Sequence, residues 1–318
     1  MTNKNVWLVG TGLMGIEYAK VLNYLHSDFL AIGRGSDNCK KFLDTVNIKP
    51  IEGGLTAFLK LNPALPEAVI VAVGVESLKN TTIELLNYGV KKILLEKPAV
   101  CHPSEISELT SLVKKKNATV LLAYNRRFYA SVRKAKEIIE QDGGAISCIF
   151  DFTEWSHMIK NLHKLPEELE TWFLGNSSHP IDTAFYLIGQ PKEMSSIYKG
   201  SLDWHPSSSV FTGSGISDQG TLFSYHANWE SPGRWNIEIM TKLHKLIFKP
   251  MEILQIQEIG SVVLKPVEID DEIDKQFKPG FFLQLKAFLA NDHQNFCDIY
   301  QQEWNMNTYY KKMSGYKN

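Results

Sequence analysis

The sequence predicts an α/β fold in two parts: a doubly wound parallel sheet, then an α/β domain with a large, mostly antiparallel open sheet. Three observations predict it. Short apolar runs alternate with amphipathic stretches over residues 1–124, as expected for parallel strands joined by crossover helices. A glycine-rich turn follows the first apolar run. Beyond residue 124, strand-like runs with polar/apolar alternation follow one another with few helices between them. We therefore expect domains at residues 1–124 and 125–318.

The first part contains recognisable strand and helix signals. The run from Ala68 onward is continuously apolar, as in a strand buried on both faces. One predicted helix stops at Gly89, a favourable residue just past a helix end. Another begins at Pro103 and ends in three lysines, which suits the helix dipole. We expect strands at residues 6–9, 29–32, 68–73, 92–95 and 119–123, and helices at 13–25, 39–46, 76–88 and 103–116.

The second part reads mainly as strands. A helix over 127–141 leads into a strand over 146–155, and several strands follow between residues 194 and 268. The clearest strand alternates Phe223, Tyr225, Ala227 and Trp229, and half of this apolar set is expected to need cover beyond the domain's own helices. Helices are expected at 179–187 and 281–289. The Ser- and Gly-rich segment 207–220 is predicted to be a mobile hairpin or loop.

Composition narrows the class of protein. The 318 residues carry a net charge of 34 − 35 = −1, so no strong positive field favours nucleic acid. The longest apolar stretch is far shorter than the roughly 20 residues of a membrane-spanning helix, and no signal peptide precedes the first strand. The four cysteines lack metal-ligand spacing, so we expect reduced thiols, no metal and a cytoplasmic protein.

The turn after the first strand has the GxGxxG spacing: Gly10, Thr11, Gly12, Leu13, Met14 and Gly15. Gly10 would permit the tight turn, Gly12 would let a pyrophosphate approach the backbone, and Gly15 would let the helix pack closely. The following helix N-terminus offers unpaired N–H groups to an anion. The motif favours a dinucleotide site, although glycines also serve plain strand-to-helix turns.

The end of the second strand bears on the choice of dinucleotide. NAD-binding domains usually carry an acidic residue there for the ribose 2′-hydroxyl, and this chain has none. Arg34 and Ser36 could hold a 2′-phosphate instead. We therefore expect NADP to be preferred over NAD, with a solvated loop arginine as the alternative.

The fourth strand ends in Glu96-Lys97-Pro98. Ligands of doubly wound sheets bind outside the carboxyl ends of the strands, so Lys97 is expected where nicotinamide and substrate meet. Further on, His179 begins a predicted helix with Asp182 three residues later, on the same helical face. A histidine suits transfer of a hydroxyl proton because its ordinary pKa lies near neutral pH.

Together these residues resemble the glucose–fructose oxidoreductase/inositol dehydrogenase (Gfo/Idh/MocA) family over essentially the whole chain. The resemblance rests on the glycine turn, Glu96-Lys97-Pro98, the run Tyr124 to Phe128 and His179-Pro180-Ile181-Asp182. It implies a Rossmann domain, a pyridine nucleotide, a sugar or cyclitol substrate, and subunits that meet through the second sheet. Family members commonly have an aspartate four residues before the histidine, where this chain has Gly175.

The predicted site follows from these observations and the resemblance. Lys97 and His179 are the predicted catalytic residues, and His179 is expected to handle the proton with Lys97 alone. Cofactor contacts are predicted for the six turn residues together with Arg34, Ser36, Glu96 and Lys97. Substrate contacts are predicted for Tyr124, Asn125, Arg126, Trp155, Asn176 and Asp182.

The predicted function is an NAD(P)-dependent oxidoreductase that moves a hydride between nicotinamide and a secondary alcohol or ketone carbon of a sugar, cyclitol or sugar derivative. Nucleotide-linked sugars are included. Two alternatives stay open: use of a bound nucleotide for transient oxidation during glycoside cleavage or elimination, and a non-catalytic nucleotide or sugar sensor. The second sheet is expected to hold a homodimer or homotetramer together.

Overall fold

The computed structural model describes residues 6–316, and this part of the chain forms two compact units. The first unit comprises the chain up to Asn125 together with Lys275–Trp304. The second comprises Arg126–Asp274 and the chain from Asn305 onward. Both units combine a sheet with helices, and the parallel and largely antiparallel sheets confirm the predicted fold class. The chain changes unit after Asn125, Asp274 and Trp304, whereas a single crossing near residue 124 was expected.

The first unit is built on a six-stranded sheet with the order β14-β5-β4-β3-β1-β2. Strands β1 to β5 run parallel and β14 is antiparallel to β5. Every residue of β1 and β3 is buried, as expected for parallel strands covered on both faces. The strands are β1 (Val6–Val9), β2 (Phe29–Ile32), β3 (Ala68–Val71), β4 (Lys92–Leu95), β5 (Thr119–Leu122) and β14 (Cys297–Asp298). The helices are α1 (Leu13–Tyr24), α2 (Ser36–Val46), α3 (Gly54–Leu59), α4 (Val75–Tyr88), α5 (Ile106–Lys116), α11 (Phe281–Leu289) and α12 (Ile299–Asn305).

Helix α11 explains why a late segment returns to the first unit. Its residues Phe281, Leu285 and Phe288 are at most 1% exposed and belong to the same hydrophobic core as α1. The rings of Tyr18 and Phe281 lie 4.7 Å apart. An apolar helix face stabilises the sheet that it covers, but the apolar pattern of the helix does not predict which of the two sheets that will be.

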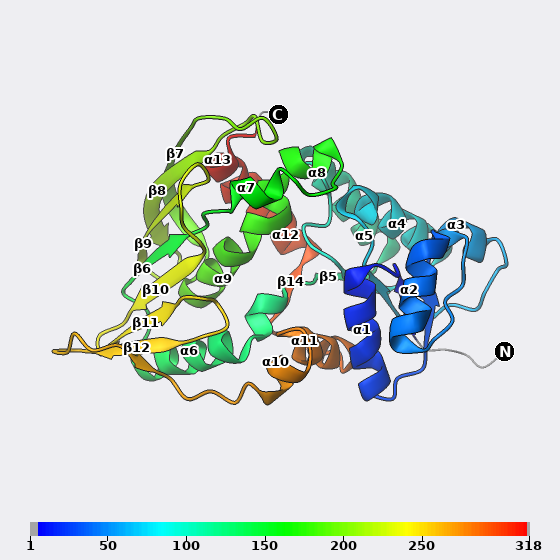
Figure 1. Ribbon diagram of the computed structural model, residues 1–318, viewed down its shortest axis with the longest axis horizontal. Helices are drawn as coiled ribbons and strands as arrows, with labels where there is room; N and C mark the ends of the chain where they lie inside the picture. The colour runs from blue at the N-terminus through cyan, green and yellow to red at the C-terminus, as the bar shows by residue number, and fades with distance from the viewer. Residues whose placement is uncertain (1–5, 317–318) are drawn as a thin grey trace. The chain divides into compact units, whose positions relative to one another are not determined.

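The second unit is built on an eight-stranded sheet with the order β13-β12-β11-β10-β6-β9-β8-β7. Neighbouring strands are antiparallel except β6 and β9, which are parallel. Figure 1 shows α9 (Ser178–Ile188) packed on one face of this sheet. The strands are β6 (Ser147–Asp151), β7 (Pro191–Lys199), β8 (Val210–Ser217), β9 (Leu222–Asn228), β10 (Asn236–Met240), β11 (His244–Phe248), β12 (Gln255–Glu258) and β13 (Lys265–Pro266). The other helices are α6 (Ala130–Gln141), α7 (Ser156–Ile159), α8 (Pro166–Glu170) and α13 (Lys311–Ser314), with α10 (Glu272–Gln276) at the crossing between the units.

The segment 207–220, predicted to be a mobile hairpin or loop, is mostly the strand β8, which pairs antiparallel with β7 and β9. The hairpin alternative is thus the one that the sheet contains. The two glycines of β8 are required by close packing within the sheet. A Cβ at Gly213 would lie 2.4 Å from the Tyr225 ring, and one at Gly215 would lie 2.7 Å from the Phe223 ring. The aromatic side chains of β9 thus cover the glycines of β8, so a composition typical of a loop forms a strand here.

The alternating apolar residues at β9 are also covered more completely than the sequence predicts. Phe223, Tyr225, Ala227 and Trp229 are at most 3% exposed, so the protomer itself covers all four. The Phe223 ring packs edge-on against Phe185 of α9, with ring centroids 5.2 Å apart. The exposed apolar residues of the sheet lie on its opposite face and include Ile149, Ile197 and Leu222.

No helix among residues 6–316 is long and apolar enough to cross a lipid bilayer.

Candidate functional site

The glycine turn has the geometry that the sequence predicts. Gly10 has φ of +116°, and a Cβ there would lie 2.2 Å from the Ala72 carbonyl oxygen. A Cβ at Gly15 would lie 2.0 Å from the Gly10 carbonyl oxygen, so α1 packs directly on the turn. Nothing lies within 4 Å of a Cβ built at Gly12. Gly10 and Gly15 are therefore sterically required, while the backbone at Gly12 faces open space where an anion can approach.

A cavity of about 550 Å³ lies beside this turn. It is formed at the carboxyl ends of β1, β2 and β3, next to the point where the strand order reverses between β1 and β3. Gly10, Thr11 and Gly12 line it. Leu13 is instead 71% exposed and Met14 packs against the core, so neither side chain lines the cavity.

The cavity wall includes Arg34 and Asn38 at the end of β2 and the start of α2. Ser36, predicted beside Arg34, is exposed and does not line the cavity. No carboxylate stands between Ile32 and Ser36, so the acid typical of a ribose 2′-hydroxyl contact is absent from this strand end. An arginine at the N-terminus of α2 favours an anionic group there.

Glu96 is tied to α1 rather than directed at the cavity beside the glycine turn. The Tyr18 hydroxyl donates to Glu96 Oε1 at 2.9 Å. Burial raises the pKa of the Glu96 carboxyl, and the Lys97 ammonium opposes that rise. The contact fixes the end of β4, and with it the backbone that carries Lys97. The direct cofactor contact predicted for Glu96 stays a prediction.

Tyr124 and Asn125 hold the end of β5 in place. Tyr124 is 1% exposed, and its hydroxyl donates to Gln302 Oε1 at 3.1 Å. Gln302 Nε2 in turn donates to the Pro98 carbonyl at 3.2 Å. Asn125 Nδ2 donates to the Pro279 carbonyl at 2.9 Å. These contacts fix both side chains at the end of β5, and the substrate-binding role predicted for them stays a prediction.

His179 lies in the first turn of α9 and is 7% exposed. A π-helical turn over Phe173–Ser177 leads into this helix, and such turns are frequent at functional sites. The His179 ring lies 6.2 Å from the Trp235 ring.

Asp182, which was predicted to orient the His179 ring, is bound by Arg127. Both of its carboxylate oxygens accept hydrogen bonds from Arg127, at 2.7 and 2.8 Å. The side chains are 1% and 7% exposed, so this is a buried bidentate ion pair. Burial raises the pKa of Asp182, and the Arg127 guanidinium opposes that rise. The pair joins α9 to the segment that opens the second unit.

Glu154 is a buried acid, bound to the segment that precedes His179, that sequence reasoning missed. It is 1% exposed and accepts from Asn176 Nδ2 at 2.9 Å, Ser177 Oγ at 2.7 Å and Arg234 Nη1 at 3.0 Å. Burial raises the pKa of its carboxyl. Asn176, predicted to bind substrate, is thus held by Glu154. The available signal was an acidic residue directly before Trp155, at the end of an apolar strand.

Aromatic rings and guanidinium groups alternate beside Glu154. Arg234 lies 4.8 Å from the Trp155 ring and 4.4 Å from the Trp235 ring, and Arg126 lies 4.7 Å from Trp235. Burial lowers the pKa of Arg126, whose Nε is buried without a hydrogen-bond partner among the described residues. Trp155 is 49% exposed, and its Nε1 donates to the Gly233 carbonyl at 2.9 Å. Arg126 and Trp155, both predicted to bind substrate, thus belong to one stack with Trp235.

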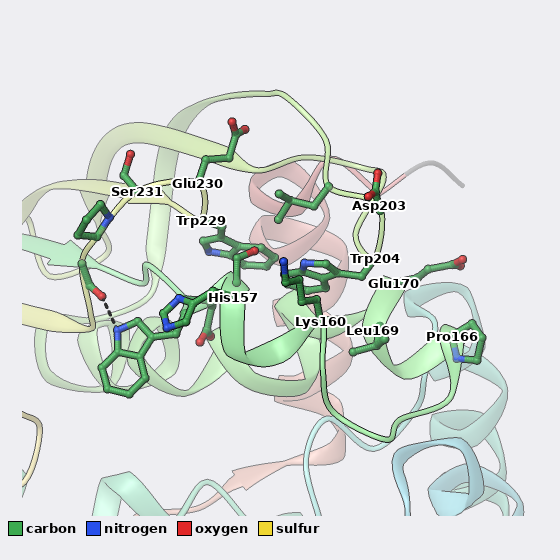
Figure 2. A pocket seen from close by; sticks show the side chains of 16 residues that line it. His157, Lys160, Pro166, Leu169, Glu170, Asp203, Trp204, Trp229, Glu230 and Ser231 are labelled. Carbon is green, nitrogen blue, oxygen red and sulfur yellow. Dashed lines mark hydrogen bonds between the residues drawn. The ribbon is translucent and has the colours of Figure 1, made fainter.

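A second, larger cavity of about 930 Å³ lies within the second unit (Figure 2). Glu154 and Trp155 line it at one side, and Trp204 and Trp229 line it as well. No group of three or more His, Cys, Asp or Glu side chains within residues 6–316 is arranged to hold a metal ion.

The glycine turn, its cavity and the parallel sheet define a Rossmann-type nucleotide-binding domain. Residues 4–124 match the model of the oxidoreductase family with an NAD-binding Rossmann fold, Gfo/Idh/MocA. Residues 4–124 are therefore similar to this family, as the glycine turn and Glu96-Lys97-Pro98 indicate. An uncharacterised oxidoreductase of Streptococcus pneumoniae serotype 4 is 23% identical over 198 residues. That match covers 61% of this chain and 53%, about half, of the relative.

Solved structures share the fold over almost the whole chain. Levoglucosan dehydrogenase in complex with NADH and L-sorbose has a TM-score of 0.77 at 16% identity, covering 98% of this chain and 97% of that one. A dehydrogenase from Clostridium difficile has a TM-score of 0.75 at 19% identity, covering 98% of each chain. UDP-N-acetylglucosamine 3-dehydrogenase from Acidithiobacillus ferrooxidans has a TM-score of 0.72 at 13% identity, covering 97% and 95%.

Proposed function

We propose that this protein is an NAD(P)-dependent oxidoreductase acting on a secondary alcohol or ketone carbon of a sugar, cyclitol or sugar derivative. One observation carries the proposal: the open backbone at Gly12, between two sterically required glycines, beside a cavity of about 550 Å³ at the strand ends. The match of residues 4–124 to the Gfo/Idh/MocA oxidoreductase model supports it. So do neighbours with the same fold that were solved with NADH and a sugar.

The residues of the first unit fit a dinucleotide. The backbone N–H groups that open α1 would bind the pyrophosphate, because Gly12 keeps that approach clear. Lys97, at the end of β4, would bind the nicotinamide ribose and polarise the reacting oxygen of the substrate. When bound, the nicotinamide ring supplies the hydride acceptor or donor.

The residues of the second unit supply the proton chemistry. His179 would take the hydroxyl proton during oxidation and return it during reduction, which is general acid–base catalysis. Glu154 would act as a positioning residue through Asn176 and Ser177, which immediately precede the helix of His179. Since position 175 is a glycine, Glu154 is the acid that reaches this segment.

The preferred nucleotide in this proposal is NADP. Arg34 lines the cavity where an NAD-specific domain would place an acid, and a guanidinium binds a 2′-phosphate through several N–H donors. The open sheet face that carries Ile149, Ile197 and Leu222 would pair with another copy of the chain, giving a homodimer or homotetramer.

The test combines binding with turnover. NADPH and NADH are titrated by fluorescence, and NADP⁺ and NAD⁺ are then incubated with a sugar and cyclitol panel while the absorbance of reduced nicotinamide is followed. The proposal predicts nucleotide binding and net reduction with at least one compound. Product formation without net reduction would instead indicate transient oxidation by a recycled nucleotide, and binding without any turnover would indicate a sensor.

A further inference from the structure

We infer that the large cavity of the second unit binds a further, non-reacting sugar ring, so that the substrate is a neutral or amino glycoside of at least two rings rather than a nucleotide-linked sugar. The inference rests on the proposed function. It concerns the residues around Trp204 and Trp229, none of which belongs to the predicted catalytic pair (Figure 2).

Trp204 forms a fixed aromatic platform in this cavity. Its ring stacks on Trp229 with centroids 5.7 Å apart and planes inclined by 4°, and the edge of Trp172 packs against it at 6.3 Å. Trp229 is 1% exposed, whereas Trp204 is half-buried and lines the cavity. The negative face of an indole attracts the weakly positive C–H groups of a sugar ring, so the platform suits a pyranose.

The loop that presents Trp204 is pinned from both sides. The backbone groups of Leu202 and His205 bond to each other at 2.9 and 3.1 Å, which closes the turn around Trp204. The ring of His205 is fixed by the Ser208 carbonyl at 2.7 Å and the Tyr316 hydroxyl at 3.1 Å. A platform held in this way loses little conformational entropy when a ligand binds.

The volume of this cavity indicates room for more than one sugar ring. About 930 Å³ lies near the upper end of the range for sites that enclose drug-sized ligands, and a single hexose fills only part of it. Glu154 lines the cavity and accepts from Ser177, two residues before His179, so it links the cavity wall to the segment that opens α9. We place the second ring of a glycoside on Trp204 and its reacting ring toward this segment.

The exposed charges around the cavity disfavour a nucleoside diphosphate as the second group. Glu170, Asp203 and Glu230 line the cavity with Lys160, and none of the four forms an ion pair within the described part of the chain. Glu154 is neutralised by Arg234. Three carboxylates against one ammonium repel a diphosphate and accept a neutral or protonated amino sugar.

The test measures binding without turnover, by calorimetry on the NADPH-loaded protein. The probes are cellobiose, maltose, lactose and diacetylchitobiose, each compared with its monosaccharides, and UDP-glucose. We expect at least one disaccharide to bind tenfold or more tightly than its monosaccharides, and UDP-glucose to bind more weakly than that disaccharide. If no disaccharide in the panel gains tenfold, or if UDP-glucose binds more tightly, the inference is wrong.

Variants locate the second ring. Trp204→Ala should weaken the favoured disaccharide about tenfold, as expected for loss of an aromatic contact, and leave the monosaccharide within twofold. Trp204→Phe should recover most of the affinity. The matched control is Tyr300→Ala, an aromatic side chain of the first unit that is 44% exposed, which should change neither ligand. Equal losses for disaccharide and monosaccharide in Trp204→Ala would overturn the assignment.

The two proposals fail separately. A disaccharide that binds through Trp204 but never reduces NADP⁺ or NAD⁺ contradicts the oxidoreductase and leaves the second-ring site standing. Reduction with monosaccharides, with no gain from a second ring, contradicts the site and leaves the oxidoreductase standing.

Discussion

The buried ion pair between Arg127 and Asp182 decides whether Asp182 supports the fold or the chemistry. Asp182→Asn leaves Arg127 buried at 7% exposure with a neutral partner in place of a bidentate carboxylate. Removing one partner of a buried ion pair costs about 3–5 kcal/mol. For a unit of this size, 1 kcal/mol shifts the melting temperature by roughly 2–4 °C. We therefore expect the transition of the second unit to fall by about 10 °C.

The assay is thermal unfolding followed by circular dichroism, with turnover measured well below the transition. The double variant Arg127→Met/Asp182→Leu should recover much of the loss, because it leaves no buried charge unpaired. The control Glu137→Gln breaks an exposed pair with Lys134 and should change the stability by less than about 1 kcal/mol. A shift below about 3 °C for Asp182→Asn, together with an altered pH profile of turnover, would refute the structural role and restore Asp182 as a partner of His179.

Three further predictions concern other parts of the molecule. Arg34→Ala should weaken NADPH about tenfold or more and leave NADH within twofold in fluorescence titrations; equal losses for both would contradict the 2′-phosphate contact. Burial lowers the pKa of His205 from 6.5 to about 4. Below pH 6.5 the unfolded chain therefore binds a proton that the folded chain does not, and the free energy of unfolding decreases as the pH falls toward 4. The loss is on the order of 3 kcal/mol. Urea unfolding at pH 7 and pH 4.5 should show a smaller difference for His205→Gln than for the wild type; an equal difference would contradict this origin. Leu222→Lys, on the exposed sheet face, should shift the sedimenting species toward monomer, and a wild type that is already monomeric at micromolar concentration would contradict the interface.

The first unit was predictable because local signals and tertiary structure agree there. A short apolar run that is rich in β-branched residues, such as Ala68–Val71, favours a strand independently of its distant neighbours. The glycine spacing also fixes a turn by sterics alone, as the Cβ positions at Gly10 and Gly15 show. These features depend on neighbours a few residues away, or on backbone that the same motif brings close.

The parts that the sequence did not reveal depend on distant partners. Gly213 and Gly215 look like loop residues until the rings of β9 are placed over them. Glu154 looks like one carboxylate among many until Asn176 and Ser177 from one segment and Arg234 from another converge on it. Periodicity carries no information about such convergence, which tertiary packing determines.

The central claim is tested most directly by comparing the wild type with His179→Gln in turnover and in NADPH affinity. Once the panel yields a substrate, the account predicts that His179→Gln lowers the rate of nicotinamide reduction by roughly 10²–10⁴-fold. The dissociation constant for NADPH should stay within twofold, because His179 and the glycine turn belong to different units. Turnover close to that of the wild type in His179→Gln, or a wild type that binds neither NADPH nor NADH, would contradict the account.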